Sequence, residues 1–528
     1  EILIGLVGSE MCIRDRIYPI GIQNFESLRL DGYFYIDKTA LIYQLVKSGR
    51  YYFLSRPRRF GKSLLISTLE AYFQGKKELF QGLAMEKLEK DWTKYPILHI
   101  DLNTQKYDSP QSLESKLNRT LVTWEKLYGS EPAEDSLSMR FEGTIQRAYE
   151  QTGQRVVILV DEYDKPMLQA IGNKELQNSF RETLKAFYGA LKSKDGCIKF
   201  AMLTGVTKFG KVSVFSDLNN LDDISMWNEY IELCGISEKE IHKNLETELH
   251  EFADVQKMTY DSFCEKLRQY YDGYHFTHNS IGMYNPFSLL NAFKRKEFGS
   301  YWFETGTPTY LVELLKRHHY NLERMAHEET NAQVLNSIDS ESTSPIPVIY
   351  QSGYLTIKGY DEEFGIYHLG FPNKEVEEGF IQFLVPYYTS MNNVESPFEI
   401  QKFVREIRSG DYNSFFQRLQ SFFADTTYEI IREQELHYEN VLFIIFKLVG
   451  FYVKVEYHTS RGRIDLVLQT DKFIYIMEFK LNGTAEEALQ QINDKHYALP
   501  FETDGRRLFK IGVNFSAETR NIEKWIVE

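Results

Sequence analysis

A glycine, a lysine and a serine stand in succession at Gly61-Lys62-Ser63, where an apolar run at 51–54 leads through a short loop into a helical pattern. This order of strand, loop and helix points backbone N–H groups and the positive end of a helix at an anion. Lys62 adds a mobile positive charge, and the Ser63 hydroxyl is a suitable ligand for Mg²⁺. The predicted chemistry is nucleotide binding, with an exposed basic loop as the alternative.

The loop departs from the general phosphate-binding pattern at one position. That pattern has a glycine five residues before Gly61, whereas Arg56 stands there. The residues expected to bind the nucleotide through this loop are Arg59, Phe60, Gly61, Lys62, Ser63 and Leu64.

Acidic residues follow a second apolar run, at 156–160. Such a run fits a strand buried on both faces of a parallel sheet, and Asp161 then emerges at the carboxyl end, where these sheets bind ligands. Asp161 can hold Mg²⁺ directly or through water, together with Ser63. Glu162 can orient the water that attacks the γ-phosphate. A solvated acidic turn is the alternative.

Thr204 ends a third strand-like run, at 199–203, and a further strand is expected at 95–102. A hydroxyl at the end of a strand beside the metal-binding strand can contact the γ-phosphate or the attacking water, although Thr204 alone also fits ordinary turn chemistry. The extra strand favours the ATPase branch with an inserted strand and a catalytic glutamate. Alternating strands and helices predict an α/β fold with a doubly wound parallel sheet.

Asp465, Glu478 and Lys480 form a second candidate site near the C-terminus. They lie in two expected strands, at 464–468 and 473–479, along which side chains alternate faces with a period of two. Glu478 and Lys480 therefore share a face that Asp465 can reach from the neighbouring strand. The two carboxylates are suited to hold Mg²⁺ or Mn²⁺, and Lys480 can stabilise the nucleophile or the transition state of phosphodiester cleavage.

A solvated surface pair is the simpler interpretation of Glu478 and Lys480 taken alone. The apolar strands weaken it, because a charge there would be costly without a metal or a partner. The C-terminal elements are expected in the order helix, three strands, helix and strand, at 438–448, 452–457, 464–468, 473–479, 485–497 and 507–515.

Five segments together resemble the AAA-ATPase-like family of bacteria, whose members commonly carry a nuclease-superfamily domain at the C-terminus. They are RPRRFGKS (56–63), LVDEYDKP (159–166), LTGV (203–206), NNL (219–221) and YWFETGTP (301–308). The resemblance covers nearly everything from Ile17 onward. It implies an ATPase, and it accounts for Arg56, since arginine-rich residues are typical of the family at that position. The resemblance does not indicate a substrate.

The C-terminal motifs resemble the PD-(D/E)XK nuclease superfamily, in the subgroup that accompanies this ATPase-like domain. The matching segments are 462–465, 478–481 and 488–492 with Tyr497. In this resemblance Asp465, Glu478 and Lys480 match the nuclease core, and Gln491 matches the polar position on the following helix. Glu439, on the preceding helix, is a candidate for a further metal ligand.

The length of 528 residues is too great for one hydrophobic core and fits two or three domains. We expect a P-loop NTPase domain, a helical connector and a C-terminal α/β fold of the restriction-nuclease type. The expected ranges are 17–240 for the ATPase, 241–375 for the connector and 376–528 for the nuclease-like domain. Residues 1–16 resemble a translated sequencing adapter and are expected to be a non-native tail.

The formal charge of −14 argues against general coating of nucleic acid but leaves local basic contacts open. The basic residues clustered around the proposed nuclease core are Arg461, Arg463, Arg506, Arg507 and Lys510. The 4 cysteines have no close metal spacing, so a reduced cytoplasmic setting is expected. No apolar run approaches the roughly 20 residues that span a bilayer.

The leading hypothesis is an enzyme that binds and hydrolyses ATP with Mg²⁺ and couples this cycle to a metal-dependent nuclease acting on DNA. The alternative is a nucleotide-dependent switch whose C-terminal domain binds nucleic acid or a protein partner without cleavage. The three ionisable groups Asp465, Glu478 and Lys480 favour cleavage, since a binding module has no need of them at one point. The sequence does not distinguish DNA from RNA as the substrate or endonuclease from exonuclease action. It also does not indicate the oligomeric state.

Overall fold

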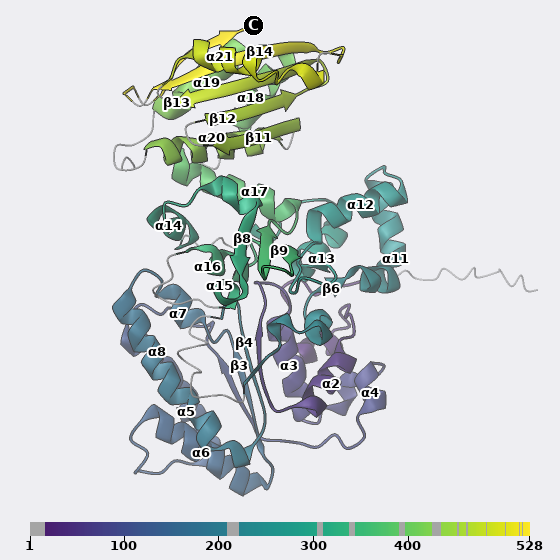
Figure 1. Ribbon diagram of the computed structural model, residues 1–528. Helices are drawn as coiled ribbons and strands as arrows, with labels where there is room; N and C mark the ends of the chain where they lie inside the picture. Colours follow the sequence, from purple (N-terminus) through teal and green to yellow (C-terminus); the bar gives the residue numbers. More distant parts are fainter. Residues whose placement is uncertain are drawn as a thin grey trace, which may run out of the picture. The chain divides into compact units, whose positions relative to one another are not determined.

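The computed structural model forms two compact units, Glu1–Gly299 with Ser337–Ser340, and Ser300–Asn336 with Glu341–Glu528. We call them unit 1 and unit 2 and describe each by itself (Figure 1). The structure describes residues 16–208, 221–303, 310–336, 344–389, 396–424, 434–450, 454–460, 463–481, 483–501, 503–516, 518–519 and 521–528.

Unit 1 is built on a five-stranded parallel sheet with the strand order β2-β3-β4-β1-β5. The strands are β1 (Tyr51–Ser55), β2 (Ile97–Asp101), β3 (Val156–Asp161), β4 (Ile198–Gly205) and β5 (Asp222–Asp223). Every residue of β1 and β3 is buried, as expected for strands covered on both faces. Because β4 lies between β1 and β3, the end of β4 separates the ends of these two strands.

Helices cover both faces of this sheet, as a doubly wound fold requires (Figure 1). On one face, Phe73 of α3 packs against Phe200 of β4 with ring centroids 5.2 Å apart. On the other, Phe141 of α6 stacks on Phe187 of α8 at 4.4 Å. The helices are α1 (Phe25–Leu30), α2 (Thr39–Ser48), α3 (Lys62–Phe73), α4 (Ala84–Leu88), α5 (Pro110–Tyr128), α6 (Leu137–Thr152), α7 (Lys165–Gln169), α8 (Lys174–Tyr188) and α9 (Ala190–Ser193).

A second group of elements completes unit 1 after β5. It comprises η3 (Ile224–Met226), η4 (Asn228–Leu233), the short antiparallel pair β6 (Ile236–Ser237) and β7 (Met283–Tyr284), and the helices α11 (Glu238–Val255), α12 (Tyr260–Tyr271) and α13 (Pro286–Arg295). At the start of helix α11 the Glu240 carboxylate accepts a hydrogen bond from the Ser237 N–H at 2.9 Å, in the manner of a capping box. Glu240 also forms an ion pair of 2.6 Å with Lys38, which ties α11 to the start of α2.

Unit 2 opens with short helices around a three-stranded antiparallel sheet of order β8-β10-β9. Its elements are α14 (Tyr310–Arg317), η6 (Leu322–Ala326), β8 (Glu328–Asn331), α15 (Ala332–Asn336), α16 (Ile346–Gln351), β9 (Thr356–Asp361), β10 (Ile366–Gly370) and α17 (Lys374–Tyr388). Strands β9 and β10 form an antiparallel hairpin, and residues 346–351 before it are helical. Pro347 at the start of α16 fits the first turn of a helix.

The C-terminal part of unit 2 is a five-stranded mixed sheet of order β11-β12-β13-β14-β15 with helices on both faces (Figure 1). Its elements are α18 (Ser396–Ser409), α19 (Tyr412–Ala424), α20 (Gln434–Gly450), β11 (Lys454–Ser460), β12 (Arg463–Gln469), β13 (Phe473–Leu481), α21 (Ala485–Asp494), β14 (Arg507–Ser516) and β15 (Asn521–Val527). The sequence predicted the elements from α20 to β14 in order, but not β15, an edge strand of mixed polar and apolar residues.

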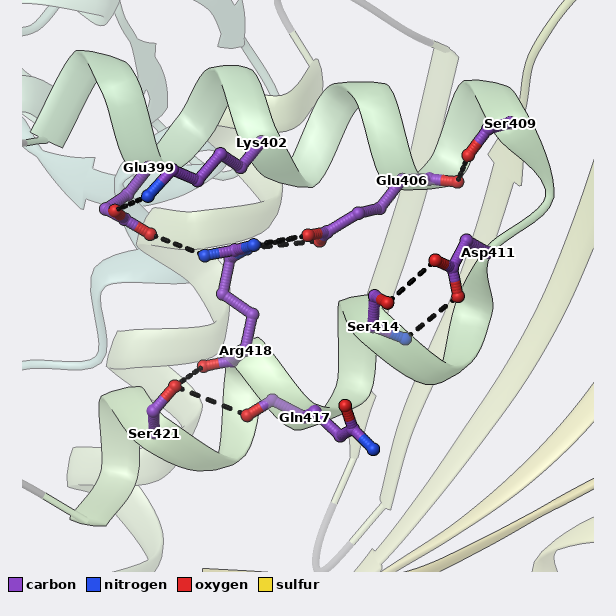
Figure 2. A network of polar contacts seen from close by, with 9 residues as sticks. All are labelled: Glu399, Lys402, Glu406, Ser409, Asp411, Ser414, Gln417, Arg418 and Ser421. Carbon is purple, nitrogen blue, oxygen red and sulfur yellow. Dashed lines mark hydrogen bonds and ion pairs between the residues drawn. The ribbon is translucent and has the colours of Figure 1, made fainter.

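Helices α18 and α19 are joined by one arginine (Figure 2). Arg418 of α19 forms ion pairs with Glu406 and, at 2.8 Å, with Glu399, both on α18. Arg418 is half-buried, so the pairing helps to fix the angle between two amphipathic helices whose apolar faces carry Phe403 and Phe415. The Arg418 ion pairs therefore have a structural role. Helix α21 packs on the opposite face of the C-terminal sheet.

Residues 300–303 and 310–336 pack with the C-terminal part of the chain, which explains where the two units divide. The backbone N–H of Trp302 donates to the buried carboxylate of Glu375 at 2.8 Å. Asn440 of α20 accepts a hydrogen bond from the Leu322 N–H at 2.8 Å and donates to the Tyr320 carbonyl. The domain boundaries expected at 240/241 and 375/376 do not coincide with this division and remain predictions.

Among the helices in the described part of the chain, none combines the length and the apolar character needed to cross a membrane.

Candidate nucleotide and nuclease sites

The loop after β1 turns the chain into α3 by way of two left-handed residues, Arg59 with φ 65° and Gly61 with φ 94°. Gly61 directly precedes α3, whose first residues are Lys62 and Ser63. Lys62 is buried, and its ammonium donates to the carbonyls of Arg56 at 3.0 Å and Pro57 at 3.2 Å. The positive end of the helix and the Lys62 charge therefore lie within one short loop.

Arg56, which replaces the first glycine of the general pattern, is 1% exposed. Its guanidinium donates to the carbonyls of Ser55 at 3.0 Å and Ser225 at 2.7 Å, and it lies 4.0 Å from the centre of the Phe276 ring. The Ser225 hydroxyl in turn accepts from the Ser55 N–H at 2.8 Å. Arg56 therefore fastens the loop to the segment after β5 and is not available as a phosphate ligand.

The Asp161 carboxylate and the Thr204 hydroxyl meet where β3 and β4 end. Thr204 Oγ1 donates to Asp161 Oδ1 at 2.6 Å, and both side chains are buried. Asp161 and the half-buried Ser63 supply hard oxygen donors of the type Mg²⁺ prefers. Mg²⁺ at phosphate sites usually takes only one or two protein ligands, so these residues fit such an ion.

Glu162 lies on the Lys62 side of this edge. Its carboxylate is 3.7 Å from Lys62 Nζ, and its backbone is left-handed with φ 56°. That conformation costs free energy for a residue with a side chain, and strain of this kind is common at functional positions. The structure thus brings together Lys62, Asp161, Glu162 and Thr204, as the sequence predicted.

The other loop residues contribute in different ways. The exposed guanidinium of Arg59 lies 4.9 Å from the Phe287 ring centre. Phe60 is buried against Tyr274, with ring centroids 4.8 Å apart. Phe60, Gly61 and Leu64 line a cavity that the sequence did not predict.

This cavity is open on one side and adjoins the start of α3. Its walls come from three stretches far apart in the sequence: the segment before β1, the first turns of α3, and the segment around η4, β6 and α13. The lining residues are Pro19, Leu28, Phe34, Tyr35, Ile36, Lys38, Ile42, Phe60, Gly61, Leu64, Leu65, Thr68, Leu233, Cys234, Gly235, Ile236, Pro286 and Leu290. An apolar cavity beside a phosphate loop fits a flat organic group attached to the phosphates.

Asp164, three residues after Asp161, is fully buried at the ends of β3 and β4. Its carboxylate accepts from the N–H of Val206 at 3.2 Å and from the N–H and hydroxyl of Thr207 at 2.6 Å each. Burial, followed by the charge of nearby Glu162, raises the pKa of Asp164 to about 6. The sequence placed Asp164 in a family motif without a role.

In the C-terminal sheet, Asp465 of β12 and Glu478 of β13 are direct antiparallel partners. Residues paired in this way project to the same face, with Cβ atoms about 4.5–5.5 Å apart. Lys480 is two residues beyond Glu478 and shares that face. The side chain of Asp465 lies outside the described residues, so its position here follows from the register alone.

The face that carries Glu478 is the one covered by α21. Ile474 and Ile476, on the same face of β13, form a core cluster with Ile492 of α21. Gly512 of β14 is the parallel partner of Glu478, and a side chain there would meet the α21 backbone at 2.1 Å. The helix therefore approaches the sheet closely beside Glu478, which is fully buried, while Lys480 is half-buried.

Among the side chains that the structure describes, no group of three or more His, Cys, Asp or Glu residues is arranged to hold a metal ion. Glu439 on α20 has its carboxylate 3.4 Å from Asn321 Nδ2. Arg506, one of the basic residues near the nuclease core, is held by Asp504 at 2.6 Å and by the Thr470 carbonyl at 2.9 Å. Lys510 donates to Asn493 at 2.7 Å. Arg461 and the side chain of Arg463 lie outside the described residues.

The parallel sheet, the inserted strand β4 and the loop before α3 define a P-loop NTPase fold of the α/β class. Residues 19–215 match the family described as predicted AAA-ATPase, and residues 433–525 match the PD-(D/E)XK nuclease superfamily.

A protein of Azotobacter chroococcum mcd 1, described as an uncharacterized protein in the vnfD 5′ region, is 35% identical over 526 residues. These cover 97% of this chain and 98% of the relative. The chain therefore belongs to the bacterial AAA-ATPase-like family with a C-terminal PD-(D/E)XK nuclease superfamily domain. Among solved structures, the ORC2 protein of Aeropyrum pernix matches 68% of this chain and 92% of its own at 11% identity. Its TM-score of 0.23 is too low to support a conclusion.

Proposed function

We propose that unit 1 binds ATP with Mg²⁺ at the carboxyl edge of its parallel sheet and hydrolyses it. The observation that carries this proposal is the convergence of Lys62, Asp161, Glu162 and Thr204 at three adjacent strand ends. Lys62 would neutralise the β and γ phosphates, and Ser63 with Asp161 would hold the ion. When bound, Mg²⁺ stabilises the charge that develops on the transferred phosphoryl group.

Glu162 is the residue placed to orient the attacking water, because it follows Asp161 and faces the Lys62 side of the site. The contacts that Lys62 makes to the neutral carbonyls of Arg56 and Pro57 are exchangeable for phosphate oxygens. Hydrogen bonds between an ammonium and a charged oxygen are roughly twice as strong as those to neutral acceptors. Thr204 holds the Asp161 carboxylate in one orientation during this exchange.

The cavity beside α3 would receive the base of the nucleotide. It lies next to Gly61, so a triphosphate on the loop would extend its nucleoside toward the apolar walls. Lys38 is the charged residue of the lining, and it is paired with Glu240.

We further propose that the ATPase cycle controls a Mg²⁺-dependent nuclease in unit 2 that acts on DNA. Asp465 and Glu478 would hold the ion, and Lys480 would stabilise the nucleophile or the transition state. The register that pairs Asp465 with Glu478 and places Lys480 on their face supports this assignment.

One observation favours a second candidate, in which the C-terminal domain binds nucleic acid or a protein without cleaving. Glu478 is 0% exposed beneath α21, whereas an ion that takes part in hydrolysis must also reach water and substrate. Cleavage would then need α21 to move.

The test of the ATPase is Mg²⁺-dependent phosphate release by the full chain and by its Lys62→Ala variant. We expect turnover by the wild type and none by Lys62→Ala, because the loop keeps its backbone N–H groups but loses the charge that bridges the phosphates. Equal turnover by the two proteins would exclude this loop as the active site.

The test of the nuclease is cleavage of double-stranded and single-stranded DNA with Mg²⁺, with and without ATP. Cleavage that depends on Mg²⁺ and changes with ATP is expected. Nucleic-acid binding without cleavage under all these conditions would instead support the binding module.

A further inference from the structure

Tyr163 and Asp164, which follow the proposed metal ligand Asp161, form several hydrogen bonds with the end of β4. The Tyr163 N–H donates to the Thr204 carbonyl at 3.0 Å, and its hydroxyl donates to the Thr207 carbonyl at 2.9 Å. Asp164 accepts from the Val206 N–H and from both the N–H and the hydroxyl of Thr207. Tyr163 and Asp164, which follow β3, therefore form hydrogen bonds with Thr204, Val206 and Thr207.

Gly205 allows this close approach because it has no side chain. A Cβ atom there would lie 2.6 Å from Asp164 Oδ1 and 2.7 Å from the Tyr163 ring. Gly205 is not among the glycines with a left-handed backbone, so the requirement is for space and not for an unusual conformation. Asp164 and Gly205 therefore fit together as two halves of one buried contact.

The contact lies one residue from Thr204, whose hydroxyl donates to Asp161 at 2.6 Å. Without the Asp164 carboxylate, the N–H groups of Val206 and Thr207 would lose a buried acceptor, which is costly enough to shift the backbone. A shift of the backbone at 206–207 would also move Thr204, because β4 ends at Gly205 and only that residue lies between them.

We propose that Asp164 and Gly205 interlock the ends of β3 and β4 and thereby position Thr204 on Asp161, which makes Asp164 a positioning residue for the Mg²⁺-dependent step. The inference rests on the proposed ATPase function and deepens it. Asp164 touches neither phosphate nor metal in this arrangement. It acts through Thr204 on the orientation of the metal ligand.

The first test compares two variants that disturb the interlock from opposite sides. Asp164→Asn replaces an acceptor oxygen with an NH₂ group that faces N–H donors. Gly205→Ala keeps the Asp164 carboxylate but adds a methyl group that clashes with it. Both should lower kcat by about tenfold or more, while the affinity for ATP in EDTA, which reports the loop alone, changes by less than about twofold. The tightening of ATP binding on adding Mg²⁺ should shrink in both variants.

Gly196→Ala is the matched control, because a Cβ atom at Gly196 meets nothing within 4 Å. It should leave kcat and both affinities unchanged. Equal loss of ATP binding in EDTA and in Mg²⁺ in the Gly205→Ala variant would overturn the proposal, since it would indicate general damage to the fold. The Gly205→Ala result stands even if Asp164→Asn fails to fold.

The second test is a double-mutant cycle with Thr204→Ala. If Asp164 acts through Thr204, then Gly205→Ala lowers kcat in the wild type but changes it by less than about twofold in the Thr204→Ala background. Multiplicative losses would overturn the positioning role. Failure of the ATPase proposal itself is separately visible, as the absence of any difference in turnover between wild type and Lys62→Ala, and it would overturn both.

Discussion

Lys62 Nζ lies 3.7 Å from the Glu162 carboxylate, and the Lys62 ammonium is almost fully buried. The two side chains come from the start of α3 and from the residue that follows β3, and these two elements pack against each other. A buried ammonium needs a counter-charge, and a triphosphate would take over this role from Glu162. Glu162 would then be released toward the γ-phosphate, where a base is required.

We therefore expect Glu162→Gln to bind ATP at least as tightly as the wild type and to hydrolyse it more slowly by about 100-fold or more, the range lost when a general base is removed. Binding is measured by titration calorimetry with Mg-ATP and turnover by phosphate release. Asp161 stays intact in this variant, so a large loss of ATP binding would contradict the separate roles of the two carboxylates.

Arg56→Gly restores the glycine of the general phosphate-loop pattern, yet we expect it to impair the protein. The substitution removes the donors to the Ser55 and Ser225 carbonyls and opens a cavity beside Phe276. A loss of about 2–4 kcal/mol in the free energy of unfolding is expected from buried groups of this kind. Denaturant unfolding of Arg56→Gly and Arg56→Lys measures it. Full stability and activity of Arg56→Gly would show that the buried guanidinium is dispensable.

Filling the cavity beside α3 should separate recognition of the base from recognition of the phosphates. Leu290→Trp adds bulk on the α13 side of the lining. We expect the affinity for ATP to fall by about tenfold, equivalent to roughly 1.4 kcal/mol, with the affinity for tripolyphosphate little changed. Competition binding with the two ligands provides the measurement. Equal weakening of both would place the base elsewhere.

In the C-terminal sheet, Asp465→Ala and Glu478→Gln should abolish Mg²⁺-dependent DNA cleavage, and Lys480→Ala should reduce it, because each removes one group of the shared face. DNA binding, followed by fluorescence anisotropy, should survive in all three. Lys472→Ala is the matched control, since Lys472 is an exposed lysine just before the same strand. Normal cleavage by Glu478→Gln would remove the nuclease assignment.

The stability of unit 1 should decrease in acid through Glu89, a carboxylate that is 6% exposed. Burial alone would raise the pKa of Glu89, but hydrogen bonds from Tyr72, Lys47 and the backbone N–H groups of Lys90 and Asp91 hold it at about 2. The folded state therefore releases this proton more readily than the unfolded chain. Its contribution is present above pH 4.5 and is lost as the pH falls toward 2.

We expect Glu89→Gln to flatten this loss and to be less stable than the wild type at neutral pH by about 2 kcal/mol. Urea unfolding between pH 7 and 3 is the measurement. Glu78→Gln, which changes an exposed carboxylate nearby, is the control. Parallel stability curves for Glu89→Gln and the wild type would exclude the assigned role.

The parallel sheet and the convergence of Lys62, Asp161, Glu162 and Thr204 could be predicted because each depends on local pattern. Continuous apolar runs indicate strands buried on both faces, and polar residues directly after them must emerge at the carboxyl edge. The same reasoning located the strands of Asp465 and Glu478, since their alternation is local too.

Features that depend on distant contacts could not be predicted from the sequence. The burial of Arg56 depends on Ser225 and Phe276, which follow far along the chain. The cavity is assembled from apolar residues that look like ordinary core positions. Strand β15 carries exposed lysine and glutamate between apolar residues, so its pairing with β14 outweighs a weak local signal.

The register of β12 and β13 also determines where the C-terminal domain tolerates changes in length. Inserting one residue between Leu466 and Gln469 would shift Asp465 by one position relative to β13 and turn it to the opposite face from Glu478. The same insertion in the turn at 470–472 would be absorbed by the loop. Loss of function in this domain can therefore arise from a change in chain length that leaves Asp465, Glu478 and Lys480 all present.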